Sequence, residues 1–256
     1  MKKTSAILLI EILTAIVFIG MIFVPRIPQD LSYHLFADKR MFFGIPNFMD
    51  IIFNIPFVVI GFVGMITLVK KISNSGKKDR AVTICYFVFF AGIFLTGFGS
   101  GYYHLNPDNL TNVWDRLPLA VSFMSLFAAI LYERIEIKGG LVFLAVLVLF
   151  GIFSIIYWYI SEQQGQGDLR PYVIVQFYPM ILIPFILLFF PSRYTRANDM
   201  WVMSGFYGLA KLFELFDKQI FVFLRFISGH TFKHIFAALA VFWILRMVEK
   251  RKMVNA

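Results

Sequence analysis

The chain contains apolar runs about 20 residues long, and this feature restricts its fold more than any other. Coiled as an α-helix, a run of that length crosses the roughly 30 Å hydrocarbon core of a bilayer. A soluble domain carries roughly 25% charged residues. In this chain of 256 residues, 15% are charged and 59% are hydrophobic. We therefore expect an all-α fold, a polytopic transmembrane helix bundle.

Eight apolar runs are candidate membrane spans. They cover residues 5–24, 48–69, 81–103, 113–132, 140–160, 172–190, 200–217 and 231–248. The first run follows Lys2 and Lys3, as in a signal peptide, but it contains Glu11 and ends without a small-residue cleavage site. We expect it to be a retained helix, so that residues 1–256 form a single integral membrane domain.

The basic residues predict the orientation of the bundle, because loops rich in Lys and Arg stay on the cytoplasmic side. Six lie in the loops of one side, namely Arg26, Lys39, Arg40, Arg170, Lys218 and Arg225. Fifteen lie on the other side, namely Lys2, Lys3, Lys70, Lys71, Lys77, Lys78, Arg80, Arg134, Lys138, Arg193, Arg196, Arg246, Lys250, Arg251 and Lys252. We therefore expect a multi-pass protein of the cell membrane with both termini in the cytoplasm. Membrane orientation also explains the net charge of +9 better than nucleic-acid binding does.

Five polar residues are predicted to meet near the outer face. Ser100 and His104 are four apart at the end of the third run, and Asp115 opens the fourth. His230 and His234 are one helical turn apart at the start of the last run. Because all three run ends lie on the outer side, these residues share one depth although more than a hundred positions separate them. Ionisable groups at membrane depth usually mark function.

Three neutral imidazoles and a water make a catalytic zinc site with an open position. Calcium and magnesium prefer oxygen ligands, so they do not fit this set. Cys85 is the one cysteine, which excludes a disulfide framework and a cysteine-based zinc site. The alternative is that each histidine is an interfacial residue bonded to backbone or headgroups, but the shared depth favours a shared site.

Other polar residues have weaker patterns. Lys211, Glu214 and Asp217 fall three apart near the outer end of the seventh run and predict an ion-pair network beside the site. Asp50 and Asn54 share a helix face and are expected to make helix-packing hydrogen bonds. An oxygen-rich cation site at Asp38 and Asn47 is an open alternative.

Together these motifs resemble the alkaline ceramidase family, which belongs to a wider group of membrane hydrolases that includes adiponectin-type receptors. The resemblance rests on Ser-x₃-His, an Asp eleven residues after that His, and His-x₃-His in the last run. The matching segments are residues 99–104, 106–109, 114–118 and 228–234. They look more like the bacterial members than the animal enzymes. The similarity covers about residues 38–250, so that residues 5–24 look like an extra helix before a seven-helix ceramidase-like core.

The resemblance implies that His104, His230 and His234 bind zinc and that Ser100 and Asp115 assist catalysis. It implies cleavage of the amide bond of ceramide or a related N-acyl lipid by metal-activated water. Animal members also carry an acidic calcium-binding segment before the core. The clustered carboxylates of that segment are missing here, which disfavours calcium.

Two further classes stay open from the sequence. One is a receptor or sensor with zinc but without turnover, since fold does not fix function. The other is an ion-coupled transporter with Lys211, Glu214 and Asp217 as the ion path. The expected partner is a membrane lipid, and no nucleic acid is expected. Nothing in the sequence indicates the oligomeric state.

Overall fold

The computed structural model describes residues 3–73, 77–135 and 141–254, and within these ranges the protein is a bundle of helices without a β-strand. The elements are α1 (Lys3–Phe23), η1 (Leu31–His34), α2 (Phe48–Ile52), α3 (Ile55–Ser73), α4 (Lys77–Leu105), α5 (Asn109–Arg134), α6 (Leu141–Gln163), α7 (Arg170–Phe189), α8 (Asp199–Leu215), α9 (Asp217–Leu224) and α10 (Gly229–Lys250). In the described part, seven helices are long and apolar enough to cross a membrane. The expected all-α polytopic bundle is confirmed.

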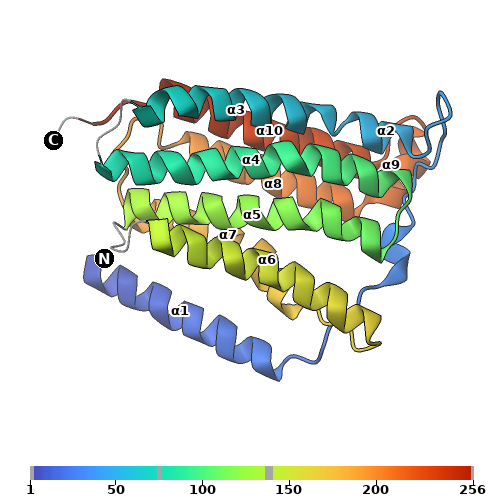
Figure 1. The fold of residues 1–256 in the computed structure, drawn as a ribbon, viewed down its shortest axis with the longest axis horizontal. Coiled ribbons are helices and arrows are strands. Elements are labelled where there is room, and N and C mark those ends of the chain that lie inside the picture. Colours follow the sequence, from blue (N-terminus) through green and yellow to red (C-terminus); the bar gives the residue numbers. More distant parts are fainter. Residues whose placement is uncertain (1–2, 74–76, 136–140, 255–256) are drawn as a thin grey trace.

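The long helices lie side by side along one axis and alternate in direction, so both termini reach the same end of the bundle (Figure 1). Helix α5 is the most enclosed, with 72% of its apolar window buried. Helix α1 is at the edge, where only 6% of the window is buried. It contacts α7 through Thr14, whose hydroxyl hydrogen bonds to that of Tyr178. The N-terminal helix is therefore peripheral, and α5 forms the centre.

Two of the predicted spans differ from the observed helices. The run 48–69 is one candidate span but two helices, because the chain turns at Phe53 and Asn54 between α2 and α3. The run 200–217 corresponds to α8, whose 17 residues make it shorter than the seven spanning candidates. Asp217, expected at the end of that run, begins α9 instead. The other predicted spans agree with the helices to within a few residues.

Helices α4 and α5 pack closely because glycine lines their contact. A Cβ atom on Gly99 would lie 1.9 Å from the carbonyl oxygen of Trp114, and one on Gly92 would lie 2.3 Å from the hydroxyl oxygen of Ser122. Only a residue without a side chain permits this approach. It brings the C-terminal end of α4 and the N-terminal end of α5 together, and Ser100, His104 and Asp115 lie at these ends.

Candidate metal centre

Three histidines from two distant parts of the chain form one buried cluster. His104 lies in the last turn of α4, and His230 and His234 lie in the first turns of α10. Each offers a ligand atom within 4.8 Å of those of the other two. The Nε2 atoms of His104 and His234 are 3.2 Å apart. The predicted convergence of these histidines is therefore confirmed.

The fourth histidine has a different environment. His34 of η1 contacts the hydroxyl of Tyr103 through Nδ1 at 2.7 Å and the side-chain oxygen of Asn109 through Nε2 at 2.9 Å. Both of its ring nitrogens are engaged, so His34 has no free ligand atom for the cluster.

The cluster fits a zinc ion by its donors and by its spacing. Imidazole nitrogens bind zinc at about 2.0–2.1 Å, which places two ligands of a tetrahedral site about 3.3 Å apart. The observed Nε2 separation of 3.2 Å matches this value. The Nδ1 atom of His104 is buried without a hydrogen-bond partner among the described residues. Imidazole also suits other transition ions, so the cluster itself shows a metal-binding capacity and not the identity of the metal.

The N-terminus of α10 is held by specific contacts that fix two of the histidines. Ser228 caps the helix by accepting a hydrogen bond from the backbone N–H of Thr231 at 3.0 Å. The carboxylate of Asp217 accepts from the backbone N–H of His230 at 2.7 Å. A Cβ atom on Gly229 would lie 2.3 Å from the carbonyl oxygen of Phe213, so α10 starts directly against the end of α8.

The segment at α2 connects both histidine-bearing helices. The side-chain amide of Asn47 donates to the carbonyl oxygen of His104 at 2.9 Å, at the end of α4. The carboxylate of Asp50 accepts from the hydroxyl of Thr231 at 2.7 Å, on α10. The bond between Asp50 and Thr231 is thus a helix-packing hydrogen bond of the kind expected, whereas the amide of Asn54 donates locally, at 2.8 Å, to the carbonyl oxygen of Asp50 four residues earlier.

The alternative of an oxygen-rich cation site finds no support. Both oxygens of Asp38 accept from the guanidinium of Arg40, at 2.7 and 2.6 Å. The side chain of Asn47 bonds to the end of α4, as described above. The guanidinium of Arg40 thus balances the charge of the buried Asp38 carboxylate.

Ser100 and Asp115 lie beside the histidines, as predicted. Both are buried, with 2% and 8% of their surfaces exposed. They come from α4 and α5 at the close contact made by Gly99. Both line the same internal chamber as His234.

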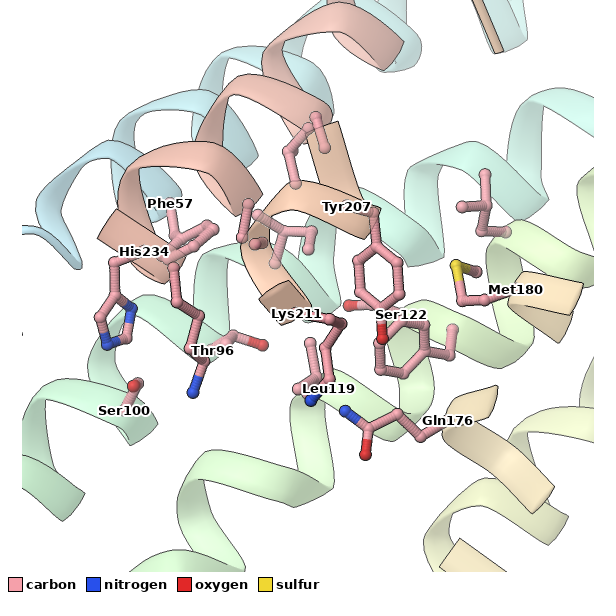
Figure 2. Close-up of a pocket in the computed structure, with 18 of the residues that line it drawn as sticks. Phe57, Thr96, Ser100, Leu119, Ser122, Gln176, Met180, Tyr207, Lys211 and His234 are labelled. Atoms are coloured by element: carbon pink, nitrogen blue, oxygen red, sulfur yellow. The ribbon is translucent and has the colours of Figure 1, made fainter. Parts of the chain in front are cut away.

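This chamber extends from the polar cluster into the middle of the bundle. The cavity has a volume of about 110 Å³. Ser100 and His234 lie on one side of it, and Tyr207 and Met180 lie across from them (Figure 2). Farther from the histidines the wall is largely apolar, with Phe89, Leu126, Val241 and Ile244 among its residues. The chamber thus combines a polar end with a long apolar part.

An ion-pair network borders the polar end, with one member that the sequence pattern does not indicate. Glu214 pairs with Lys211 on its own helix and with Lys233 of α10, the latter at 2.8 Å. The Nζ atom of Lys233 is also 3.4 Å from Nε2 of His230. Asp217 was predicted to join the network but bonds to the backbone N–H groups of His230 and Ala37. In the sequence, Lys233 lies between the candidate ligands His230 and His234, and this position is the feature that could have indicated its place in the network.

No known family model and no curated protein matches this chain. The functional interpretation therefore depends on the buried histidines, the residues around them and the chamber.

Proposed function

We propose that this protein is a zinc-dependent intramembrane amidohydrolase that cleaves the amide bond of an N-acyl lipid. The observation that carries the proposal is a cluster of three buried histidines, with Ser100 and Asp115 beside it, at the end of a largely apolar chamber. The resemblance of these five residues to the alkaline ceramidase pattern supports it. Ceramide and other N-acyl lipids with two apolar parts are the candidate substrates.

Zinc at the three histidines would lower the pKa of a bound water towards about 7 and would polarise the substrate carbonyl. We assign Asp115 the role of the general base that accepts the proton of the attacking water; its alternative role is to orient a ligand histidine. As the base, Asp115 then delivers that proton to the amide nitrogen, so that the C–N bond breaks and a neutral amine leaves. The hydroxyl of Ser100 donates a hydrogen bond to the oxygen that gains negative charge.

The chamber explains how a lipid would be placed for this reaction. An acyl chain in its apolar part brings the amide carbonyl to the end that holds Ser100, Asp115 and His234. Thr96 and Ser122 also line the chamber, but their hydroxyls donate to carbonyl oxygens of their own helices, at 2.8 and 3.0 Å. Because these hydroxyls are satisfied, the wall stays compatible with a hydrocarbon chain.

We place both termini in the cytoplasm and the site near the outer face. The excess of fifteen basic residues over six supports this orientation. The histidine-bearing ends of α4 and α10 lie at the end of the bundle opposite to the two termini (Figure 1). Cysteine labelling of an added residue at each terminus, in intact and in permeabilised cells, tests it.

The decisive experiment measures the metal content of the purified protein and then its turnover of N-acyl lipids in detergent. We expect about one zinc per chain, loss of zinc and turnover in His230→Ala, and retention of both in the control His34→Ala. Zinc without hydrolysis of any lipid in a panel of ceramides and simpler N-acyl amides would favour the receptor or sensor class. Proton flux driven by a solute in liposomes would instead favour a transporter.

A further inference from the structure

Arg116 is a buried cation that makes no ion-pair contact or hydrogen bond in the described part of the chain, although the charge of the neighbouring Asp115 acts on it. Only 5% of its surface is exposed, and its Nη1 atom has no hydrogen-bond acceptor. An arginine inside a membrane bundle is normally paired, because an unpaired buried charge is costly. The other two basic residues near the chamber, Lys211 and Lys233, both pair with Glu214. Among the basic residues described near the chamber, Arg116 is therefore the one that is free to bind an incoming anion.

The surroundings of Arg116 stabilise its charge but offer its N–H groups no acceptor. Its guanidinium carbon lies 4.5 Å from the ring centre of Trp158 and 5.1 Å from the ring centres of both Tyr33 and Tyr172. Such cation–π contacts favour the charge without satisfying its donors. The rings come from η1, α6 and α7 and hold the flat guanidinium in place.

Two more buried donors near Arg116 lack partners. The indole Nε1 atom of Trp158 has no acceptor among the described residues, and the side-chain nitrogen and side-chain oxygen of Asn112 both lack a partner there. Asn112 lies one helical turn before Arg116 on α5, on the same face. Buried donors are normally hydrogen-bonded, and here three belong to one neighbourhood. An anion with several oxygens would supply the acceptors that these groups lack.

This neighbourhood adjoins the candidate reaction chamber. Tyr33 and Tyr172, which flank the guanidinium, also line the chamber together with Asp115. Tyr33 lines, in addition, a hollow on the outer side that His230 borders. A headgroup at the outer end of the chamber would therefore lie next to Arg116, while the attached chain extends into the apolar part.

We propose that Arg116, with Asn112 and Trp158, binds the acidic headgroup of the lipid that occupies the chamber. This inference rests on the proposed function and narrows its substrate class to N-acyl lipids with a carboxylate or phosphate group. A guanidinium binds either oxyanion through two parallel hydrogen bonds. A neutral headgroup, such as the diol end of ceramide, would leave the charge of Arg116 unpaired.

The test uses probes that cannot be hydrolysed, so that binding is measured independently of turnover. Tetradecyloxyacetate carries a carboxylate, 2-(tetradecyloxy)ethanol is its neutral counterpart, and tetradecyl phosphate distinguishes phosphate from carboxylate. Affinities for the whole protein in neutral detergent are obtained from the concentration dependence of Tm. We expect wild type to prefer an acidic probe over the alcohol by at least about 10-fold.

Variants show whether the preference comes from this site. In Arg116→Gln the preference for the acidic probe should fall below about 3-fold, and Arg116→Lys should retain part of it because the charge remains. Trp158→Phe keeps an aromatic side chain but replaces the indole with a phenyl ring that has no N–H, so it should weaken acidic-probe binding alone. Arg225→Gln, which removes an exposed charge, is the control and should behave as wild type.

The outcomes separate this inference from the proposed function. Equal affinity of wild type for the acidic and neutral probes would overturn the headgroup site while leaving zinc-dependent hydrolysis intact. An unchanged preference in both Arg116 variants would also overturn it. If the preference depends on Arg116 but no N-acyl lipid is hydrolysed, the headgroup site stands and the hydrolase proposal fails.

Discussion

The Nε2 atoms of His104 and His234 lie 3.2 Å apart, although 130 residues separate the two histidines along the chain. This proximity depends on how the ends of α4 and α10 are fixed. Asn47 bonds to the end of α4, and Asp50 of α2 bonds to Thr231 of α10. The geometry of the metal centre is thus coupled to a short segment that contributes no ligand.

Thr231→Val tests this coupling, because it removes the hydroxyl that donates to the buried carboxylate of Asp50. We expect the free energy of unfolding to fall by about 1–3 kcal/mol, the cost of leaving a buried polar group without a partner. Zinc affinity, measured by competition with a chelator, should fall by about 10-fold. Thr96→Val is the matched control, because the Thr96 hydroxyl bonds only to its own helix. Equal zinc affinities in the two variants would contradict the bracing role of Asp50.

Asp115→Asn separates catalysis from metal binding. The amide cannot accept the proton of the attacking water, so we expect kcat to fall by about 10²–10⁴. Ser100→Ala should lower kcat by about 10²–10³ through loss of one hydrogen bond to the oxyanion. Both variants should keep the zinc of wild type, as measured by mass spectrometry. Loss of zinc in either one would make that residue part of the metal site instead.

Gly99→Ala tests the close packing that brings Ser100 and Asp115 together. The added methyl group would meet the carbonyl oxygen of Trp114 at 1.9 Å, so α4 and α5 must separate. We expect a loss of about 2–3 kcal/mol in the free energy of unfolding. Gly101→Ala is the control on the same helix, where nothing lies within 4 Å of the new Cβ. It should be neutral or stabilise by up to about 1 kcal/mol, because alanine favours helix more than glycine does.

Asp168 makes a contribution to stability that should depend on pH. Burial raises the pKa of this carboxyl, but hydrogen bonds and charge from Arg170 outweigh it, so the pKa lies below its usual range. The contribution of Asp168 to the free energy of unfolding is fully present above the unfolded-state pKa of about 3.9. It is lost as the pH falls through the lower pKa of the folded state. Arg170 also donates to the carbonyl oxygen of Val24 at 2.7 Å, just after α1. Asp168→Asn should therefore lower Tm at about pH 7, and its difference from wild type should shrink at about pH 3.

The positions of the spans and of the candidate metal ligands could be predicted because each follows from a strong local pattern. An apolar run fixes a membrane helix, and alternating direction then places the ends of α4 and α10 on one side. The i, i+4 spacing of His230 and His234 puts both on one helix face.

The contacts around the ligands could not be predicted, because they join residues whose spacing carries no signal. Asp38 was considered as a cation ligand, but Arg40 two residues away takes both of its oxygens. Helical spacing groups Asp217 with Lys211 and Glu214, yet α8 ends at Leu215 and Asp217 begins the separate helix α9. The pairing of Lys233 with Glu214 depends on how α10 packs against α8. The aromatic rings around Arg116 come from three further elements, η1, α6 and α7.

Glu214→Gln tests the ion-pair network at the polar end of the chamber. Glu214 is the shared partner of Lys211 and Lys233, so its neutralisation leaves two cations unpaired next to His230. We expect a loss on the order of 3 kcal/mol in the free energy of unfolding. Because the nearby positive charge also disfavours a metal cation, zinc affinity should fall as well. Lys211→Met is the matched control, because it removes one cation and leaves the Glu214–Lys233 pair. The losses of unfolding free energy and of zinc affinity should both be clearly smaller in this variant. Equal effects of the two substitutions would show that Glu214 does not balance both lysines.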